Sequence, residues 1–281
     1  MIDALLHYRF LQNALFACIL ASIVCGIIGV IIVEKKLVMM SGGIAHTSYG
    51  GVGLGYLMGF TPIIGAFIFS VCAALGIGYI KRKGGNRSDL IIALFWSLGM
   101  ALGILFIAMM PGYPPDMGSY LFGSILSVTK SDLSLMICLT VIVTLVVFIF
   151  YQNWKAYLFD DEFASIIGMK TAVMEYALLV LTAMTVVVLI KVVGIILVLA
   201  LLAAPAAAAA ALTSNLKNRI IYSIIFGTVF CFAGLWISYE LNIASGAAIV
   251  TLSVACCMIL YTAKAICEKI KKRMITAGKL S

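Results

Sequence analysis

The sequence contains few charged residues. Only 11% of its 281 positions are Asp, Glu, Lys or Arg, whereas about a quarter of the residues in a soluble domain are charged. Hydrophobic residues fill 64% of the chain, and the mean hydropathy is +1.19. So few charges could not keep the surface of a soluble protein of this length hydrated. The composition therefore excludes an ordinary soluble fold and indicates that a lipid bilayer surrounds the chain.

The sequence also lacks the common catalytic motifs. It contains no GxxxxGK phosphate loop, no HExxH helix and no GxSxG elbow. We therefore expect no enzyme activity in this chain. Any uphill transport must draw its energy from a separate ATPase subunit or from an ion gradient.

Acidic side chains are scarce inside the apolar runs. All eleven lie at or near predicted loop ends: Asp3, Glu34, Asp89, Asp116, Asp132, Asp160, Asp161, Glu162, Glu175, Glu240 and Glu268. Ion-coupled carriers need ionisable groups within the bilayer to hold the coupling ion. The pattern disfavours an ion-coupled secondary transporter, which remains the alternative function. A structural scaffold, a third function class, would leave a central histidine and an acidic loop helix unexplained.

Long unbroken apolar runs are what the sequence does contain. Inside hydrocarbon every backbone polar group must be bonded internally, and unbroken runs favour helices over a β-barrel, whose strands alternate. We predict an all-α polytopic bundle of about nine transmembrane helices, with eight to ten as the range, in a single domain over residues 1–281. The expected spans are 11–33, 37–59, 63–80, 90–110, 133–151, 171–190, 192–212, 220–238 and 247–263. Residues 117–128 are too short to cross and are interpreted as a re-entrant or interfacial helix.

The positions of Lys and Arg predict the orientation. Sixteen of the nineteen fall in the loops after spans 1, 3, 5 and 7 or in the tail 264–281, and positive charge gathers in cytoplasmic loops. We therefore expect a multi-pass protein of the cell membrane, with its N-terminus outside and its C-terminus in the cytoplasm. The net charge of +8 is then an orientation signal, and no nucleic-acid partner is expected.

The longest cytoplasmic connection is predicted over residues 152–170. Asp160, Asp161 and Glu162 suit the first turn of a short helix, and Gly168 is placed to end it. A solvated linker is one interpretation. However, a helix of two or three turns carrying Phe163 and Ile166 would expose apolar side chains that favour a protein partner.

Span 37–59 carries the most unusual residues. His46 lies roughly 15 Å from its cytoplasmic edge at Lys36, near the midplane of a core about 30 Å thick. An ionisable group at that depth indicates a functional site, and imidazole is a common ligand of zinc and similar metals. A neutral histidine bonded to a neighbouring helix is the alternative. The residues expected to line a pathway with it are Ser41, Gly42, Gly43, Thr47 and Tyr49.

Glycine and proline mark two packing features. Gly51, Gly55 and Gly59 follow one another at intervals of four, which predicts a smooth stripe for close helix packing. Pro205 stands inside span 192–212, where it removes a backbone hydrogen bond and predicts a helix kink. An alanine run follows it at 206–211 and suits a dimer axis or a gate.

Four motifs in order resemble the membrane subunit of the ABC-3 family of metal-uptake ABC transporters, over residues 11–263. The first is Met-Ser-Gly-Gly-Ile-Ala-His at 40–46 with Gly-Gly-Val-Gly at 50–53, and the second is Ser-Tyr-Leu-Phe-Gly-Ser-Ile-Leu at 119–126 with Ser-Asp-Leu at 131–133. The third is Phe-Asp-Asp-Glu-Phe-Ala at 159–164 with Gly168. The fourth is Val-Gly-Ile-Ile-Leu-Val at 193–198 with Leu-Leu-Ala-Ala-Pro-Ala at 201–206.

The resemblance implies a permease subunit that imports a divalent metal, with zinc expected first and then manganese or iron. It implies three partners: a separate ATPase subunit, an extracellular metal-binding protein and a second permease copy in a homodimer. No permanently bound cofactor is implied, because the metal is the transported substrate. By resemblance, His46 is a metal ligand, and the ATPase-coupling residues are Asp160, Asp161, Glu162, Phe163, Ala164, Ile166 and Gly168. Many family members carry Asp at the position of Gly42, so the ligand set here differs from theirs.

Overall fold

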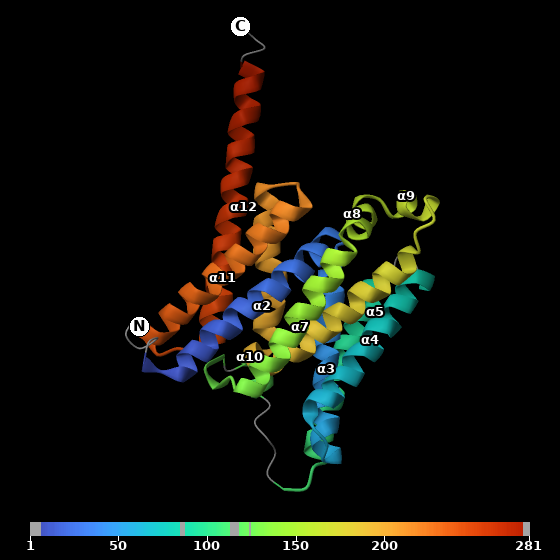
Figure 1. Cartoon of the computed structure of the whole chain (residues 1–281), viewed down its shortest axis with the longest axis vertical. Coiled ribbons are helices and arrows are strands. Elements are labelled where there is room, and N and C mark those ends of the chain that lie inside the picture. Colours follow the sequence, from blue (N-terminus) through green and yellow to red (C-terminus); the bar gives the residue numbers. More distant parts are fainter. Residues whose placement is uncertain (1–6, 85–87, 113–117, 124, 278–281) are drawn as a thin grey trace.

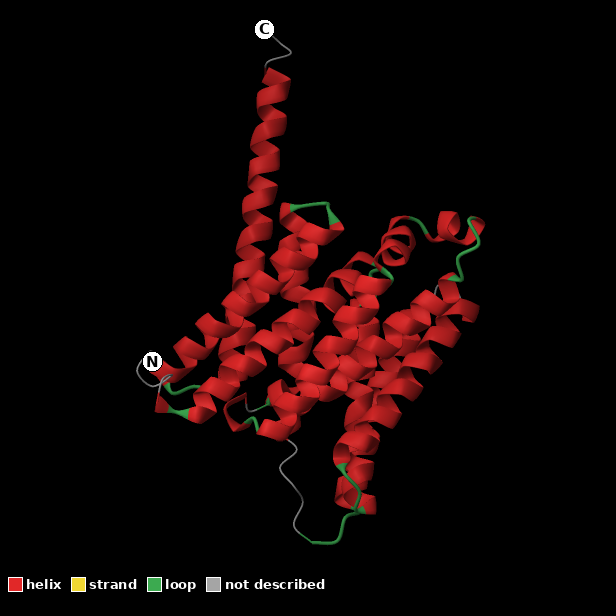
Figure 2. Cartoon of the chain, in the orientation of Figure 1, coloured by secondary structure: helices red, strands yellow, loops and turns green. Residues whose placement is uncertain are grey.

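The computed structural model describes residues 7–84, 88–112, 118–123 and 125–277, which are helical nearly throughout and contain no strand (Figures 1 and 2). The long helices are α2 (Arg9–Glu34), α3 (Val38–Met58), α4 (Pro62–Gly84), α5 (Ser88–Ala108), α7 (Lys130–Ile149), α10 (Thr171–Leu212), α11 (Leu216–Leu241) and α12 (Ser245–Ala277). The short ones are α6 (Gly118–Phe122), the 3-10 turn η2 (Ile125–Ser127), α8 (Tyr151–Phe159) and α9 (Asp161–Ile166). The predicted all-α membrane bundle is confirmed.

The number of membrane-crossing segments in the described part of the chain matches the prediction once α3 and α10 are considered. Seven helices are long and apolar enough to span a bilayer, and α3 is not among them. Glycines, hydroxyl side chains and His46 lower the hydropathy of α3, but most of its residues are covered by neighbouring helices rather than by lipid. Helix α10, with 42 residues, contains two of the predicted spans. The described residues therefore hold nine crossing segments.

Helix α10 breaks at Gly194, whose φ of 79° and ψ of 159° are not helical. Its first part starts beside α4, where Glu175 pairs with Lys81. It reaches the opposite end of the bundle, where Lys191 pairs with Asp132. Its second part returns, because the carbonyl of Thr213 at its end accepts a hydrogen bond from Arg219 of α11, which pairs with Glu34 at the end of α2. The positive φ explains why glycine stands at this turn. Pro205 lies in the second part at helical dihedrals, and a smaller kink there stays a prediction.

The segment predicted to be re-entrant forms two short turns, α6 and η2, that do not cross the bundle. Gly123 follows α6 with a φ of 70°, and a Cβ at this position would lie 2.2 Å from the carbonyl carbon of Val193. The segment therefore packs directly on the turn of α10. Parts of the predicted segment and of the neighbouring loop, namely Ser124 and residues 113–117, lie outside the described residues.

Ion pairs define two ends of the bundle. At the α9 end, Lys35 pairs with Asp161, Glu34 with Arg219, and Glu175 with Lys81 and Arg82. At the α6 end, Asp132 pairs with Lys191. The loops predicted to share one side of the membrane therefore do meet at one end of the molecule.

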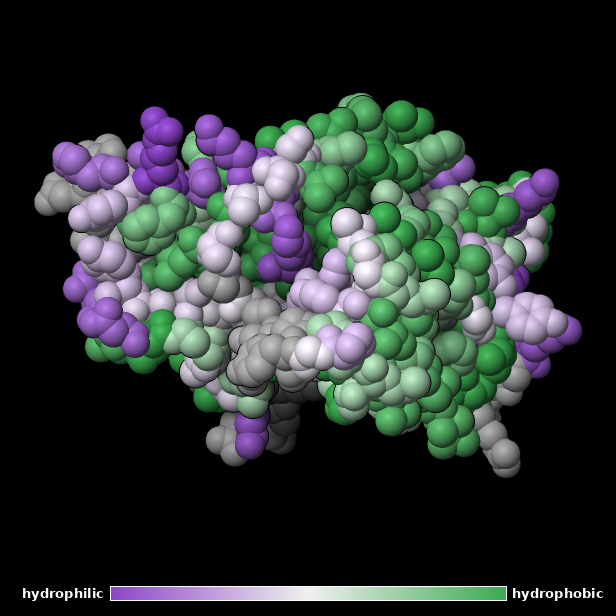
Figure 3. Space-filling model, turned by 90° about the horizontal axis from the view of Figure 1, so that it is seen from below, coloured by the Kyte–Doolittle hydropathy of each residue, from purple (hydrophilic) through white to green (hydrophobic). Residues whose placement is uncertain are grey.

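Helices α2 and α10 form the centre of the fold. Of their most apolar windows, 72% and 67% are buried inside the chain, against 22–39% for the other five candidate spans. The surrounding helices expose apolar side chains outward, including Phe16, Leu94 and Phe148. Seen from below, the side where α3, α4 and α5 lie is broadly apolar (Figure 3). Such a surface is stable in contact with lipid or with another apolar chain.

Helix α12 continues far beyond the bundle at the α9 end (Figure 1). Its outer part carries Lys264, Glu268 and Lys269, all exposed. The basic tail predicted over residues 264–281 is thus a helical extension as far as Ala277, the last described residue.

Helix α3 lies at backbone distance from both α4 and α5. A Cβ at Gly51 would lie 2.0 Å from the carbonyl oxygen of Gly65 on α4, and one at Gly53 would lie 2.6 Å from that of Gly103 on α5. The predicted glycine stripe therefore packs on α4 through Gly51 and Gly55, whereas Gly59 ends α3 in the left-handed conformation.

We predict that Gly51→Ala destabilises the protein by about 1–3 kcal/mol, because the new methyl group meets backbone atoms that cannot move without separating α3 from α4. Thermal unfolding of the detergent-purified protein measures the effect. Gly76→Ala is the matched control, since its Cβ would meet only the tip of the Phe95 side chain at 3.2 Å. Equal melting temperatures for the two variants would contradict the backbone contact.

Candidate metal-transit site and coupling face

His46 lies near the middle of α3, about 12 Å along the helix from Val38 and about 18 Å from Met58. Its imidazole stacks on the indole of Trp96, with ring centroids 4.0 Å apart and planes inclined by 11°. Its Nδ1 atom lies 3.5 Å from the thioether sulfur of Met100. Trp96 and Met100 belong to α5 and are four residues apart, so they share one face of that helix. The structure thus brings an imidazole, an indole and a thioether together at mid-depth.

The residues predicted to line a pathway surround His46 but are covered within the single chain. Ser41 donates a hydrogen bond to the carbonyl of Val38, and Thr47 donates to those of Gly43 and Phe95, at 2.7, 2.7 and 3.0 Å. Tyr49 is also buried.

Helix α5 covers the two glycines of the same group. A Cβ on Gly42 would lie 3.3 Å from the Trp96 ring, and one on Gly43 would lie 2.8 Å from Ile92. A pathway role for these five residues stays a prediction, and it would require α5 or α3 to move.

No group of three or more His, Cys, Asp or Glu side chains in the described residues is arranged to hold a metal ion. The partners of His46 therefore come from other residue types. Trp96 and Met100 are not among the site residues predicted from the sequence. Their spacing of four in the span 90–110 shows that they share a helix face, but nothing in the sequence says that this face meets His46.

Helix α9 forms as predicted at its N-terminus but is shorter than expected. The Asp160 carboxylate accepts hydrogen bonds from the backbone N–H groups of Glu162 and Phe163, and Gly168 ends the segment with a φ of 84°. The helix covers six residues, which is less than the predicted two or three turns. The preceding chain forms a separate helix, α8, which was not predicted.

One side of α9 packs inward and the other is exposed. Ala164 is fully buried, whereas Phe163 is 53% and Ile166 82% exposed. Phe159 at the end of α8 and Ile167 are also exposed. Side chains of this size in contact with water indicate an interaction surface. We call Phe159, Phe163, Ile166 and Ile167 the coupling face.

Lys35 attaches α9 to the end of α2. Its ammonium group pairs with Asp161 and lies 3.8 Å from the centroid of the Tyr157 ring on α8. The Lys35 side chain is only 12% exposed and Tyr157 is buried, so the cation–π contact is shielded from water and is stronger than a surface contact. The ion pair is open to solvent on the Asp161 side, which is 58% exposed. Burial raises the pKa of Tyr157 well above its usual range, so the ring stays neutral beneath the cation.

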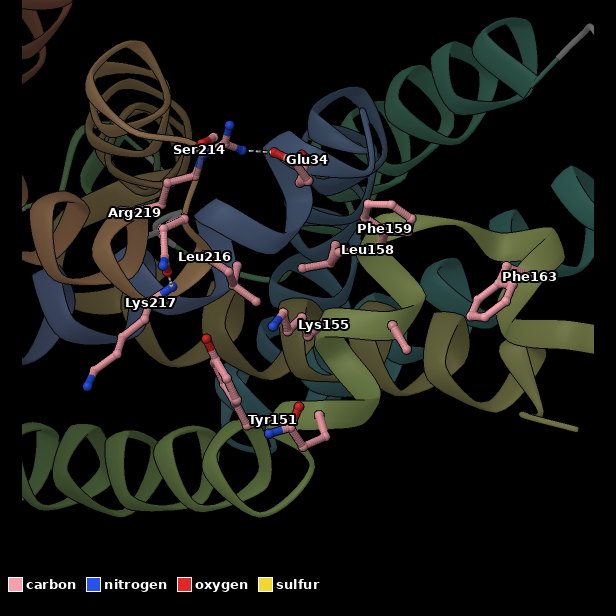
Figure 4. Close-up of a pocket in the computed structure, with 13 residues that line it drawn as sticks. Glu34, Tyr151, Lys155, Leu158, Phe159, Phe163, Ser214, Leu216, Lys217 and Arg219 are labelled. Carbon is pink, nitrogen blue, oxygen red and sulfur yellow. Dashed lines mark hydrogen bonds and ion pairs between the residues drawn. The ribbon is translucent and has the colours of Figure 1, made fainter. Parts of the chain in front are cut away.

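A groove of about 560 Å³ opens between α8 and the turn that joins α10 to α11 (Figure 4). Phe159 and Phe163 of the coupling face line it together with Lys155, Lys217 and Arg219. Arg219 also pairs with Glu34, the residue before Lys35. The end of α2 thus contacts both walls of the groove.

Comparisons with known proteins agree with this architecture. Residues 7–264 match the family described as the ABC 3 transport family. The chain is 36% identical over 252 residues to the manganese transport system membrane protein MntC of Listeria monocytogenes, covering 90% of each protein. It is 41% identical over 256 residues to an uncharacterized membrane protein, slr2045, of Synechocystis, covering 90% of this chain and 91% of the relative.

A solved structure supports the same assignment. PsaBC from Streptococcus pneumoniae in complex with Fab contains a chain that superimposes with a TM-score of 0.84 at 34% identity, over 92% of this chain and 94% of that one. The match extends over nearly all the described helices. The chain therefore belongs to the ABC 3 transport family, as a permease of metal ABC importers.

Proposed function

We propose that this chain carries a divalent transition metal ion into the cytoplasm through a pathway that passes His46, with zinc ahead of manganese or iron. The observation that carries the proposal is a half-buried imidazole at mid-depth in α3, a helix that is not among the seven most apolar spans. Ionisable groups at such a depth mark ion or substrate pathways. The metal is the substrate and no resident cofactor is proposed.

The buried acidic side chains disfavour ion coupling. Within the described residues, Asp132 and Glu175 are the buried carboxylates, and each lies at an end of the bundle in an ion pair with Lys or Arg. Neither is placed to hold a coupling ion at mid-depth. The energy is therefore assigned to ATP hydrolysis on a separate subunit that docks on the coupling face.

Two further partners complete the proposed assembly. A second permease copy forms a homodimer, since the exposed apolar sides of the bundle can cover one another. An extracellular metal-binding protein delivers the ion to the α6 end. The relatives named as manganese transport proteins support a metal substrate, and membership of the ABC 3 transport family supports an assembly with an ATPase.

The proposed orientation places the α9 end in the cytoplasm and the α6 end outside. We predict that, on a Cys-free background, a membrane-impermeant maleimide labels Ser131→Cys in intact cells but labels Ser214→Cys only after permeabilisation. Both serines are exposed, and they belong to opposite ends. The basic residues near Ser214 favour the inner side. Labelling of both positions from the same side would refute this topology.

The coupling face is expected to bind the ATPase subunit. The double substitution Phe163→Glu with Ile166→Glu should abolish ATP-dependent metal uptake and co-purification of the ATPase, because it puts two charges into a buried apolar contact. Phe163→Leu with Ile166→Leu is the matched control and should retain both. Survival of uptake and association in the Glu variant would rule out docking at this face.

His46 is expected to be essential for uptake but not for assembly. His46→Ala should lower metal uptake at limiting metal by about tenfold or more, while the permease still folds and co-purifies with its ATPase. His7→Ala, which changes the other histidine, located at the start of the described chain, should transport normally. If His46→Ala transports at the parental rate, His46 only packs between helices and the proposed pathway is wrong.

A further inference from the structure

In the described part of the chain, His46 contacts Trp96 and Met100, and no three His, Cys, Asp or Glu side chains are grouped to hold a metal ion. The position one helical turn before His46 is Gly42, which has no side chain. The Trp96 ring occupies the space beside Gly42, because a Cβ at that position would lie 3.3 Å from the indole. The same indole stacks on His46. Gly42 and Trp96 are thus complementary in shape, and an aromatic ring fills the space into which a side chain at position 42 would project.

We propose that Trp96 and Met100 set the metal preference of the transit site at His46, so that it favours zinc, a borderline-soft ion, over manganese. This inference rests on the proposed function of His46. Met100 acts as the second ligand, and Trp96 is a positioning residue that holds the imidazole and excludes a carboxylate.

The distance between the two donor atoms fits a shared ion. Zinc binds imidazole nitrogen at about 2.0 Å and thiolate sulfur at about 2.3 Å, so two such ligands in tetrahedral geometry lie about 3.5 Å from each other. Nδ1 of His46 and the sulfur of Met100 are 3.5 Å apart. The separation of the two donor atoms therefore matches the one that a shared ion requires.

The chemistry of these donors separates zinc from manganese. Thioether and imidazole ligands suit zinc, copper and iron, whereas carboxylate, carbonyl and water oxygens suit manganese. A site with one imidazole nitrogen and one thioether sulfur therefore offers zinc two well-matched protein ligands and manganese none. Two protein ligands also leave the remaining positions to water, which allows the ion to leave again, as transport requires.

Stacking explains the role of Trp96. The nearly parallel rings prevent the imidazole from rotating away from Met100, and a fixed ligand orientation raises metal affinity. The indole also covers the side of α3 that carries Gly42, so oxygen ligands from that side cannot reach the ion.

The test compares zinc and manganese uptake by the complete importer, with the same ATPase and binding protein for every variant. Met100→Leu removes the sulfur at similar volume and should lower the zinc-to-manganese uptake ratio by about tenfold or more. Met100→Gln replaces the sulfur with an oxygen donor of similar reach and should shift the ratio further toward manganese. Met184→Leu on α10 is the matched control and should leave the ratio unchanged.

A second variant restores a carboxylate. Gly42→Asp combined with Trp96→Ala makes room for the new side chain beside His46 and should raise manganese uptake relative to zinc. If a Met100→Leu variant transports with an unchanged zinc-to-manganese uptake ratio, Met100 is not a ligand. If the Gly42→Asp, Trp96→Ala variant leaves that uptake ratio unchanged, Trp96 does not exclude a carboxylate. Either result leaves the His46 pathway intact, whereas parental uptake by His46→Ala would overturn the pathway itself.

Discussion

The backbone-to-backbone packing of α3 is the contact on which the candidate site depends. Gly51 faces Gly65 of α4, and Gly53 faces Gly103 of α5, at distances that leave no room for a side chain. Apolar side chains gain little by associating in lipid, so close van der Waals packing must hold such helices together. This packing lets a polar helix occupy the interior of the bundle and brings α5 against His46. Larger residues at these positions would separate Trp96 and Met100 from the imidazole.

The end of α2 connects the coupling face to α2 and α10, the two central helices of the bundle. Lys35 holds α9 through Asp161 and the Tyr157 ring, while Glu34 holds the start of α11 through Arg219. Helix α2 also packs on the returning part of α10, because a Cβ at Gly29 would lie 2.2 Å from the carbonyl oxygen of Leu202. A movement of α9 imposed by a docked ATPase would therefore displace α2 and α10 together, through contiguous packed elements.

Much of the fold could be predicted from the sequence. The spans 171–190 and 192–212 match the two parts of α10, and the short segment near residues 117–128 does not cross. These features depend on apolar run lengths, which the sequence displays directly. The length of α9 and the residue at which α10 breaks were less accessible. The predicted spans put the break near residue 191, and the structure places it at Gly194, where a positive φ and the contact with Gly123 come together.

The sequence by itself determined that the chain is a polytopic helical membrane protein, that its basic loops lie on one side, and that His46 stands at mid-depth. These properties follow from composition, run length and position along one helix. Only the tertiary structure decided which side chains meet His46. Met100 is 54 positions away, and its contact with the imidazole arises because glycines allow α3 and α5 to approach at backbone distance. Such a contact depends on the rotation and separation of two helices, which no pattern within either helix specifies.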